Sequence, residues 1–208
     1  MSLTPEQISV LDTIRKEWDQ AEEDIKLAEQ VCNDIIVPAV KELRYGGRRL
    51  IDLIQKIITD PTSPEVPKLL ADAEFDCHRA RHDAIDAGSA KIAIQLEIMV
   101  EKLTYEVILA VYPEFRQLAL QVLEVRQRIV ESRRNRTERQ KIYAVIETAR
   151  FPELVGKYNE MRVSEPIMRA MAKRSRWRDF YGKWGFLIGV AGFAIAIVGI
   201  YLAYHPPR

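Results

Sequence analysis

The chain has 208 residues, of which 48% are hydrophobic and 29% charged, and its formal net charge at pH 7 is +1. This length allows one domain of ordinary size with a short appended segment, and the balanced charge excludes a chain that is basic or acidic throughout. The balance hides an asymmetry, because residues 1–168 are mildly acidic while residues 169–183 hold six basic side chains and one carboxylate, that of Asp179. The sequence therefore predicts an acidic body followed by a basic segment.

Four Pro-Glu pairs predict the starts of helices in the body. They occur in the tetrapeptides TPEQ at residue 4, SPEV at 63, YPEF at 112 and FPEL at 151. Proline suits the first helical turn because its missing amide hydrogen would be unpaired there, and a following Glu favours the positive end of the helix dipole. Thr4 and Gln7 also fit a capping box, and Ser63 can cap its helix through its hydroxyl oxygen.

The apolar spacing of residues 11–39 predicts a helix with a coiled-coil stripe. Steps of three and four alternate through Leu11, Ile14, Trp18, Ala21, Ile25, Ala28, Cys32, Ile35 and Ala39. This is a heptad repeat, and we expect Pro38 to bend the helix near its end. We expect Gly46 and Gly47 to break or hinge the chain. A phosphate-binding turn at these glycines, with Arg48 and Arg49, is the less favoured alternative.

The next segment, residues 66–112, is also predicted to be helical, with a weak point at Gly88 and Ser89. Its second half is apolar on nearly every side and should be the most buried helix. A further helix should follow Pro113, and no stretch of the body alternates with the period of a strand. We therefore expect an all-α bundle of long antiparallel helices over residues 1–164. Its two cysteines, Cys32 and Cys77, should be free thiols of a reducing compartment.

One face of the second segment carries the only pattern that resembles a metal site. Glu74, His78, His82 and Asp86 follow one another at intervals of four residues, so they share one side of a helix, and two His at i and i+4 can bind one metal ion. A solvated face of mixed charges explains the same residues through ordinary i,i+4 contacts and is the favoured interpretation. The acidic partners of a di-iron site cannot be identified, and we predict no cofactor.

Residues 126–141 form an arginine-rich run with few aromatic side chains. The run contains Arg126, Arg128, Arg133, Arg134, Arg136, Arg139 and Lys141, interleaved with Glu131 and Glu138. Clustered arginine can neutralise phosphates, but the acidic body and the scarcity of stacking residues, with only Tyr143 nearby, disfavour nucleic acid as a partner. A solvated face, or contact with an acidic partner or anionic lipid, is the favoured interpretation.

Residues 165–183 form a basic amphipathic segment that is rich in aromatic side chains. The residues that we expect at a membrane surface are Lys173, Arg174, Arg176, Trp177, Arg178, Lys183 and Trp184. Such a segment lies well on an anionic bilayer, where each basic side chain contributes about 1 kcal/mol. The alternative is a plain charged flank of a membrane span, which does not need the aromatic residues.

Residues 184–204 predict a single transmembrane helix. The run has 21 residues without a charge, close to the ~20 needed to cross the hydrocarbon core, with Trp184 and Tyr204 at its edges. Basic residues gather before the run and only Arg208 follows it in the short tail 205–208, so the positive-inside tendency places the N-terminal body in the cytoplasm. The charged N-terminus predicts no cleavable export signal, and the chain is expected to be tail-anchored.

A stripe of small residues follows this predicted span. It consists of Gly185, Gly189, Gly192, Ala196, Gly199 and Ala203, in steps of four and three. Small residues let helix backbones approach closely in lipid, so the stripe favours self-association or pairing with another span. No charged or amide side chain lies within the run, which disfavours an ion-selective channel built from this helix alone.

The sequence offers little for catalysis, with three histidines and no nucleophile motif, so we expect no enzyme. The favoured function is a tail-anchored, self-associating helical scaffold or adaptor that faces the cytoplasm. Its expected partners are an anionic bilayer, further copies of the chain and a cytoplasmic protein. The first alternative is an oligomerising effector that perturbs a membrane, as a toxin or defence protein does. The second is a metal-binding helical enzyme at Glu74, His78, His82 and Asp86.

Overall fold

The computed structural model describes residues 4–135 and 137–204, with the side chains of all these residues except 148–149, 178–187, 190–192 and 194–204. All regular secondary structure in the described part is helical. The helices are α1 (Pro5–Cys32), α2 (Val37–Thr59), α3 (Glu65–Lys102), α4 (Tyr105–Val111), α5 (Phe115–Arg134), α6 (Arg139–Val145), η1 (Ile146–Arg150) and α7 (Phe151–Tyr204). The predicted all-α architecture is confirmed.

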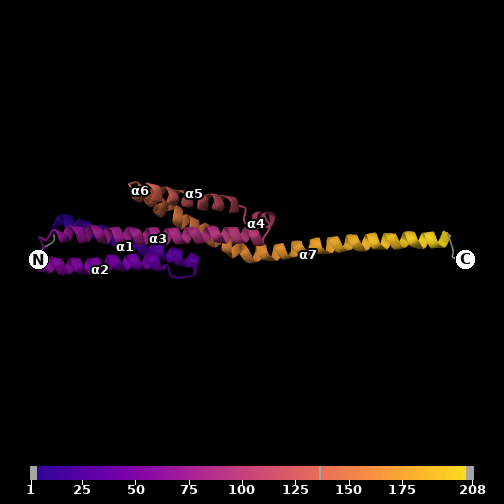
Figure 1. Cartoon of the computed structure of the whole chain (residues 1–208), viewed down its shortest axis with the longest axis horizontal. Helices are drawn as coiled ribbons and strands as arrows, with labels where there is room; N and C mark the ends of the chain where they lie inside the picture. Colours follow the sequence, from indigo (N-terminus) through magenta and orange to yellow (C-terminus); the bar gives the residue numbers. More distant parts are fainter. Residues whose placement is uncertain (1–3, 136, 205–208) are drawn as a thin grey trace.

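The long helices run alternately along one axis, so that the bundle is antiparallel and elongated (Figure 1). α3 is the central helix, because α1, α2 and α5 all pack against it. The short α4 lies at the end of α3, and α7 begins after α6 and η1 with Phe151 against Gly88, near the middle of α3. Buried residues come from both halves of α3, whereas Ile94 and Val100 in its second half are exposed. The whole of α3, rather than its second half alone, therefore forms the centre of the core.

The first helix ends earlier than its heptad stripe predicts. Asn33 takes a left-handed conformation with φ of 52°, and its amide donates to the carbonyl of Glu29 at 2.7 Å, which closes α1 after Cys32. Asn tolerates this conformation better than most residues. Pro38 lies in the first turn of α2, where its missing donor costs nothing. The prediction of one helix bent at Pro38 is therefore wrong.

The glycines inside the body do not break helices. α2 continues through Gly46 and Gly47, and α3 continues through Gly88, so both predicted weak points are wrong. A Cβ atom at Gly88 would lie 2.7 Å from Cζ of Phe151, and one at Gly47 would lie 3.2 Å from the Trp18 ring. These positions have glycine because an aromatic side chain of a neighbouring helix lies directly against the backbone.

Three of the four predicted helix starts are confirmed. The side chains of Thr4 and Gln7 form the capping box, α3 begins at Glu65 and α5 at Phe115. Ser63 accepts the amide of Glu65 at 3.4 Å, but the N-cap residue of α3 is Pro64 and the helix has no side-chain cap hydrogen bond, so the predicted capping role of Ser63 is wrong. The fourth start differs, because α6, the π-helical turn η1 and α7 follow one another without an intervening loop.

Helix α7 begins in the core and extends far beyond the other helices (Figure 1). Phe151, Leu154, Tyr158 and Met161 are buried among the other helices. The helix continues through Pro166 to Tyr204, so the boundary expected between residues 164 and 165 does not coincide with a break in the helix. Proline removes one backbone hydrogen bond there and leaves the helix intact.

The backbone of residues 184–204, the predicted membrane span, forms the last part of α7. Most side chains of this run are outside the described residues. Among the residues that were described, no helix is both long enough and apolar enough to cross a membrane.

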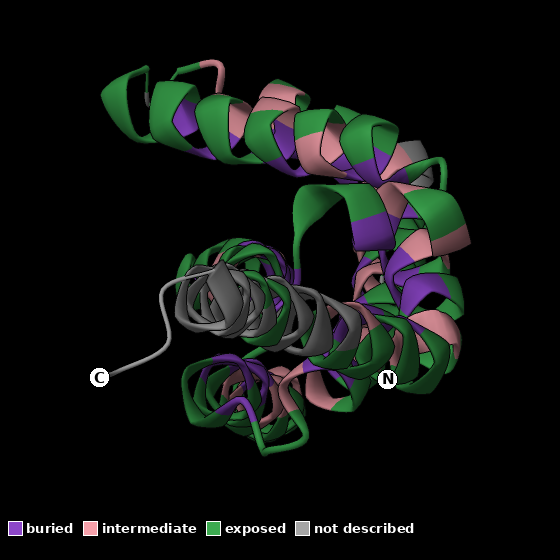
Figure 2. Ribbon diagram, turned by 90° about the vertical axis from the view of Figure 1, so that its right-hand side faces the viewer, coloured by how far each residue is buried: buried purple, intermediate pink, exposed green. Residues whose placement is uncertain are grey.

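The core consists of apolar residues on the facing sides of the helices (Figure 2). Its largest fully buried side chains include Ile14, Ile92, Leu118, Phe151 and Met168, which come from four different helices. Cys77 is buried, Cys32 is partly buried, and both are free, as predicted. Burial raises the pKa of the Cys77 thiol to about 12, so this thiol stays protonated at neutral pH.

Candidate functional site

The four residues of the predicted metal site share one face of α3, but each contacts different groups. His78 Nδ1 lies 3.3 Å from a carboxylate oxygen of Glu17, and the His82 ring stacks on Tyr143 with centroids 3.6 Å apart. Glu74 lies 3.9 Å from His78, and Asp86 accepts hydrogen bonds from Tyr143 and Arg133. Within the described residues, no three His, Cys, Asp or Glu side chains are gathered where they could hold a metal ion. The metal hypothesis thus gains no support.

The same region holds a buried charged cluster centred on Arg81, which we call the Arg81 cluster. The Arg81 guanidinium contacts Glu17 at 2.6 Å, Asp24 at 3.2 Å and Glu147 at 2.8 Å. Two separate elements supply these carboxylates: α1 gives Glu17 and Asp24, and η1 gives Glu147, while Arg81 lies on α3. Arg81 itself is 5% exposed. One cation therefore joins α1, α3 and η1 from inside the bundle.

Burial dominates the protonation of the Arg81 cluster. It raises the pKa of Glu147 to about 7 and that of Asp24 to about 6, although the nearby Arg81 acts in the opposite direction. Burial also lowers the pKa of His82 to about 3, so this ring is neutral at physiological pH. His82 Nε2 and Glu147 Oε1 are buried, have no hydrogen-bond partner among the described residues and lie 3.7 Å apart. The charged groups of the cluster therefore lie in a low-dielectric environment, and their main contacts are with one another.

Sequence reasoning missed the Arg81 cluster, although one signal was present. Glu17 and Asp24 are seven residues apart and flank the apolar stripe of α1, which is an unusual place for two carboxylates. Their cation, however, is 57 residues further along the chain from Asp24. Spacing within one segment cannot show a contact of that kind.

The basic residues of the two other sequence patterns are mostly engaged within the bundle. Arg49 contacts Asp76 at 2.6 Å and Asp72 at 3.2 Å, and Arg48 pairs with Asp52. In the arginine-rich run, Arg133 contacts Asp86 at 2.7 Å. Because α2 is unbroken at its glycines, the phosphate-binding turn is not formed, and Arg49 instead ties α2 to α3.

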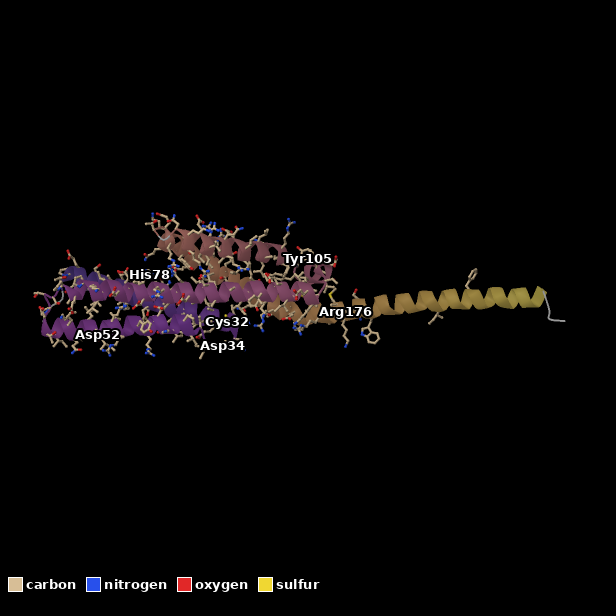
Figure 3. All side chains as sticks on the ribbon, viewed as in Figure 1. Cys32, Asp34, Asp52, His78, Tyr105 and Arg176 are labelled. Carbon is tan, nitrogen blue, oxygen red and sulfur yellow. The ribbon has the colours of Figure 1, made fainter. Side chains whose placement is uncertain are left out.

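A cavity of about 450 Å³ lies at the end of the bundle from which α7 emerges. Its walls are the last turns of α3 and one face of α7, and its lining residues are Gln95, Ile98, Met99, Lys102, Leu103, Glu165, Arg169, Lys173 and Arg176. Figure 3 shows the labelled Arg176 at this end, near Tyr105 and far from His78. We call this the α3–α7 cavity. Four basic side chains line it against one carboxylate.

Four of the predicted membrane-surface residues have described side chains, and these lie at this end of the molecule. Lys173, Arg174, Arg176 and Trp177 are exposed on α7, and Arg176 donates to the carbonyl of Lys102 at 2.7 Å. The side chains of Arg178, Lys183 and Trp184 lie outside the described residues. Sequence reasoning therefore identified one wall of the cavity, while Lys102 and Arg169 were missed.

Most of the predicted small-residue stripe also lies outside the described side chains. Gly189 is the exception: it is exposed, and a Cβ atom built there would meet no atom within 4 Å. Ile188 and Phe193 beside it are 68% and 69% exposed. Nothing in the described part of the chain packs against α7 at this point.

No protein-family model, curated protein or solved structure matches this chain.

Proposed function

We propose that the chain is a membrane-anchored, self-associating helical protein that acts as a non-enzymatic scaffold or adaptor at the cytoplasmic face of a membrane. The observation that carries the proposal is the course of α7. One helix includes core residues such as Phe151, the exposed basic residues near Lys173 and the uncharged run 184–204. A helix of this composition suits a bundle held close to a bilayer.

The charge pattern along α7 supports the anchor. Residues 184–204 contain no charged residue, and the preceding turns present Lys173, Arg174 and Arg176 at the surface. Basic residues on one side of a span favour the cytoplasm for that side, and each one near an anionic surface contributes about 1 kcal/mol. The exposed Trp177 is suited to the headgroup region.

Exposed small and apolar residues support association with other chains. Gly189 has open space around it in the chain's own fold, as a helix-contact position in lipid requires. On α2, Ile51, Ile54 and Ile58 are spaced by three and four residues and are 59%, 58% and 64% exposed. An apolar helical stripe of this kind is typical of a surface that binds another protein.

A charge in the predicted span tests the anchor in the full-length chain. Ile195→Arg places a cation near its centre, where the insertion cost is about 2.5–3.5 kcal/mol, and Tyr204→Arg places the same cation at its edge. We expect alkaline extraction to release the Ile195→Arg protein from membranes while the wild type and Tyr204→Arg remain bound. Equal retention of both variants would refute the anchor.

The stripe of small residues also favours the second candidate, an oligomer that perturbs the bilayer. Dye release from anionic liposomes separates the two functions. Sealed liposomes support the scaffold, whereas leakage with wild type that is lost when Gly185, Gly189 and Gly192 are all replaced by Leu supports the effector. Elution mass in detergent checks that the triple substitution weakens self-association in either case.

A further inference from the structure

We propose that the α3–α7 cavity binds a phosphorylated polyol, such as the headgroup of an inositol lipid. This inference rests on the proposed membrane anchor for its position, and on the cavity's own charges for its chemistry.

The four basic residues come from two helices and converge on one space. On α7, Glu165, Arg169, Lys173 and Arg176 lie at intervals of four, four and three residues, so they share one helical face. Lys102 faces them from the last turn of α3. Residues 74 positions apart in sequence are joined here, since Arg176 donates to the Lys102 carbonyl at 2.7 Å.

The cavity has an excess of positive charge, because its basic side chains outnumber its carboxylates. Glu165 is its single carboxylate and pairs with Arg169, with Nε 3.0 Å from Oε1. Arg176 contacts the Lys102 carbonyl and so offsets the negative end of the α3 dipole. The ammonium groups of Lys102 and Lys173 have no ion pair among the described residues. Two lysines thus remain for an anion.

Phosphate is the anion that fits these groups. Lysine and arginine bind phosphate oxygens through charge-assisted hydrogen bonds, and several such groups together favour a multiply charged ligand. The volume of about 450 Å³ lies in the range of small-molecule sites and exceeds the needs of a single inorganic ion. Ile98, Met99 and Leu103 add apolar surface that can contact the carbon ring of a polyol.

The distance from the predicted span selects the headgroup. Arg176 precedes Trp184 by eight residues, which is about 12 Å along a helix. The polar layer of a bilayer is about 5–8 Å deep on each side. A phosphodiester in that layer falls short of the cavity, whereas a phosphate on an extended polyol headgroup can reach it. A soluble polyol phosphate carries the same chemistry.

The test uses the full-length protein in neutral detergent and titrates it with inositol trisphosphate by calorimetry. The cavity variant is Lys102→Gln with Lys173→Gln, and the matched control is Lys68→Gln with Lys91→Gln, which removes the same charge from lysines outside the cavity. We expect the cavity variant to bind at least tenfold more weakly than the wild type and the control to stay within twofold. Absence of binding by wild type, or equal weakening in both variants, would overturn the proposal.

A second titration identifies the source of the ligand. The protein is placed in phosphatidylcholine nanodiscs with or without phosphatidylinositol bisphosphate, and inositol trisphosphate is added to each. Both outcomes support the phosphate site: suppressed binding in discs with the inositol lipid shows that the lipid headgroup occupies it, and unchanged binding assigns it to a soluble polyol phosphate. The detergent titration needs no anchor, so failure of the anchor and failure of the cavity remain distinguishable.

Discussion

The Arg81 cluster and the α3–α7 cavity are opposite arrangements of the same kinds of residue. In the cluster one buried cation meets three carboxylates, and their contacts join three helical elements. In the cavity four cations meet one carboxylate at a surface that solvent reaches. Charges that are neutralised inside a bundle hold its elements in place, whereas charges left in excess at a surface attract a ligand. The difference supports a structural role for the first site and fits the binding role that we propose for the second.

Removal of the central cation should have the largest effect. Arg81→Met leaves Glu17, Asp24 and Glu147 without their shared cation, and an uncompensated buried charge costs about 3–5 kcal/mol. We expect the free energy of unfolding, measured with urea in neutral detergent, to fall by that amount. Arg48→Met, which removes an exposed arginine paired with Asp52, should change it by less than about 0.5 kcal/mol. Similar losses in the two variants would contradict a structural role for the cluster.

Glu147→Gln should change the free energy of unfolding by an intermediate amount, and this change should depend on pH. The pKa of Glu147 rises from its ordinary 4.5 to about 7 in the folded chain, so the folded state binds a proton more readily than the unfolded state between these values. The stability contributed by this group is therefore present below pH 4.5 and is lost as the pH rises through 7. Glutamine does not titrate, so the stability of the variant relative to wild type should increase from pH 5 to pH 7.5 by about 2 kcal/mol.

Urea unfolding at several pH values measures this difference. Asp24, with a pKa raised to about 6, contributes in the same direction as Glu147, and His82, with a pKa lowered to about 3, contributes in the opposite direction. Both are present in wild type and variant, and the comparison of the two proteins removes most of their effect. A difference that stays constant with pH would show that Glu147 is ionised throughout.

The smallest change in stability is expected at the cavity. Lys102 and Lys173 are exposed and have no ion pair among the described residues, so replacing both by Gln removes no folding contact. We expect the free energy of unfolding to stay within about 0.5 kcal/mol of wild type while the binding of inositol trisphosphate weakens at least tenfold. A loss above about 1 kcal/mol would make these lysines structural and remove the contrast with the Arg81 cluster.

The sequence predicted the elements of this fold better than their ends. Periodicity and the Pro-Glu pairs identified helices, and the capping box at Thr4 was correct in detail. Gly46, Gly47 and Gly88 predict helix breaks from sequence alone because glycine is a weak helix former. A single sequence does not distinguish a glycine that makes room for an aromatic ring, such as Phe151 or Trp18, from a glycine that ends a helix. The difference depends on a residue that is distant along the chain.

The candidate sites show the same limit. The i,i+4 spacing placed His78 and His82 correctly on one face of α3, but the groups opposite them, Glu17 and Glu147, come from other elements. Likewise, the basic residues of α7 were evident from composition, and Lys102 opposite them was not. The spacing of residues within one segment shows which side chains share a helix face. Only the packing of the helices shows which residues of other elements contact that face.

The continuity of α7 has a mechanical consequence. A helix is stiff over this length, and its first turns are fixed in the core by Phe151, Leu154 and Tyr158. If a bilayer holds the outer end, the bundle cannot swivel freely, as it would on a flexible linker. A tilt or rotation of the outer end then acts as a torque on the inner end, directly beside η1 and its Glu147. Held in that way, α7 would act as a lever whose short arm lies in the bundle.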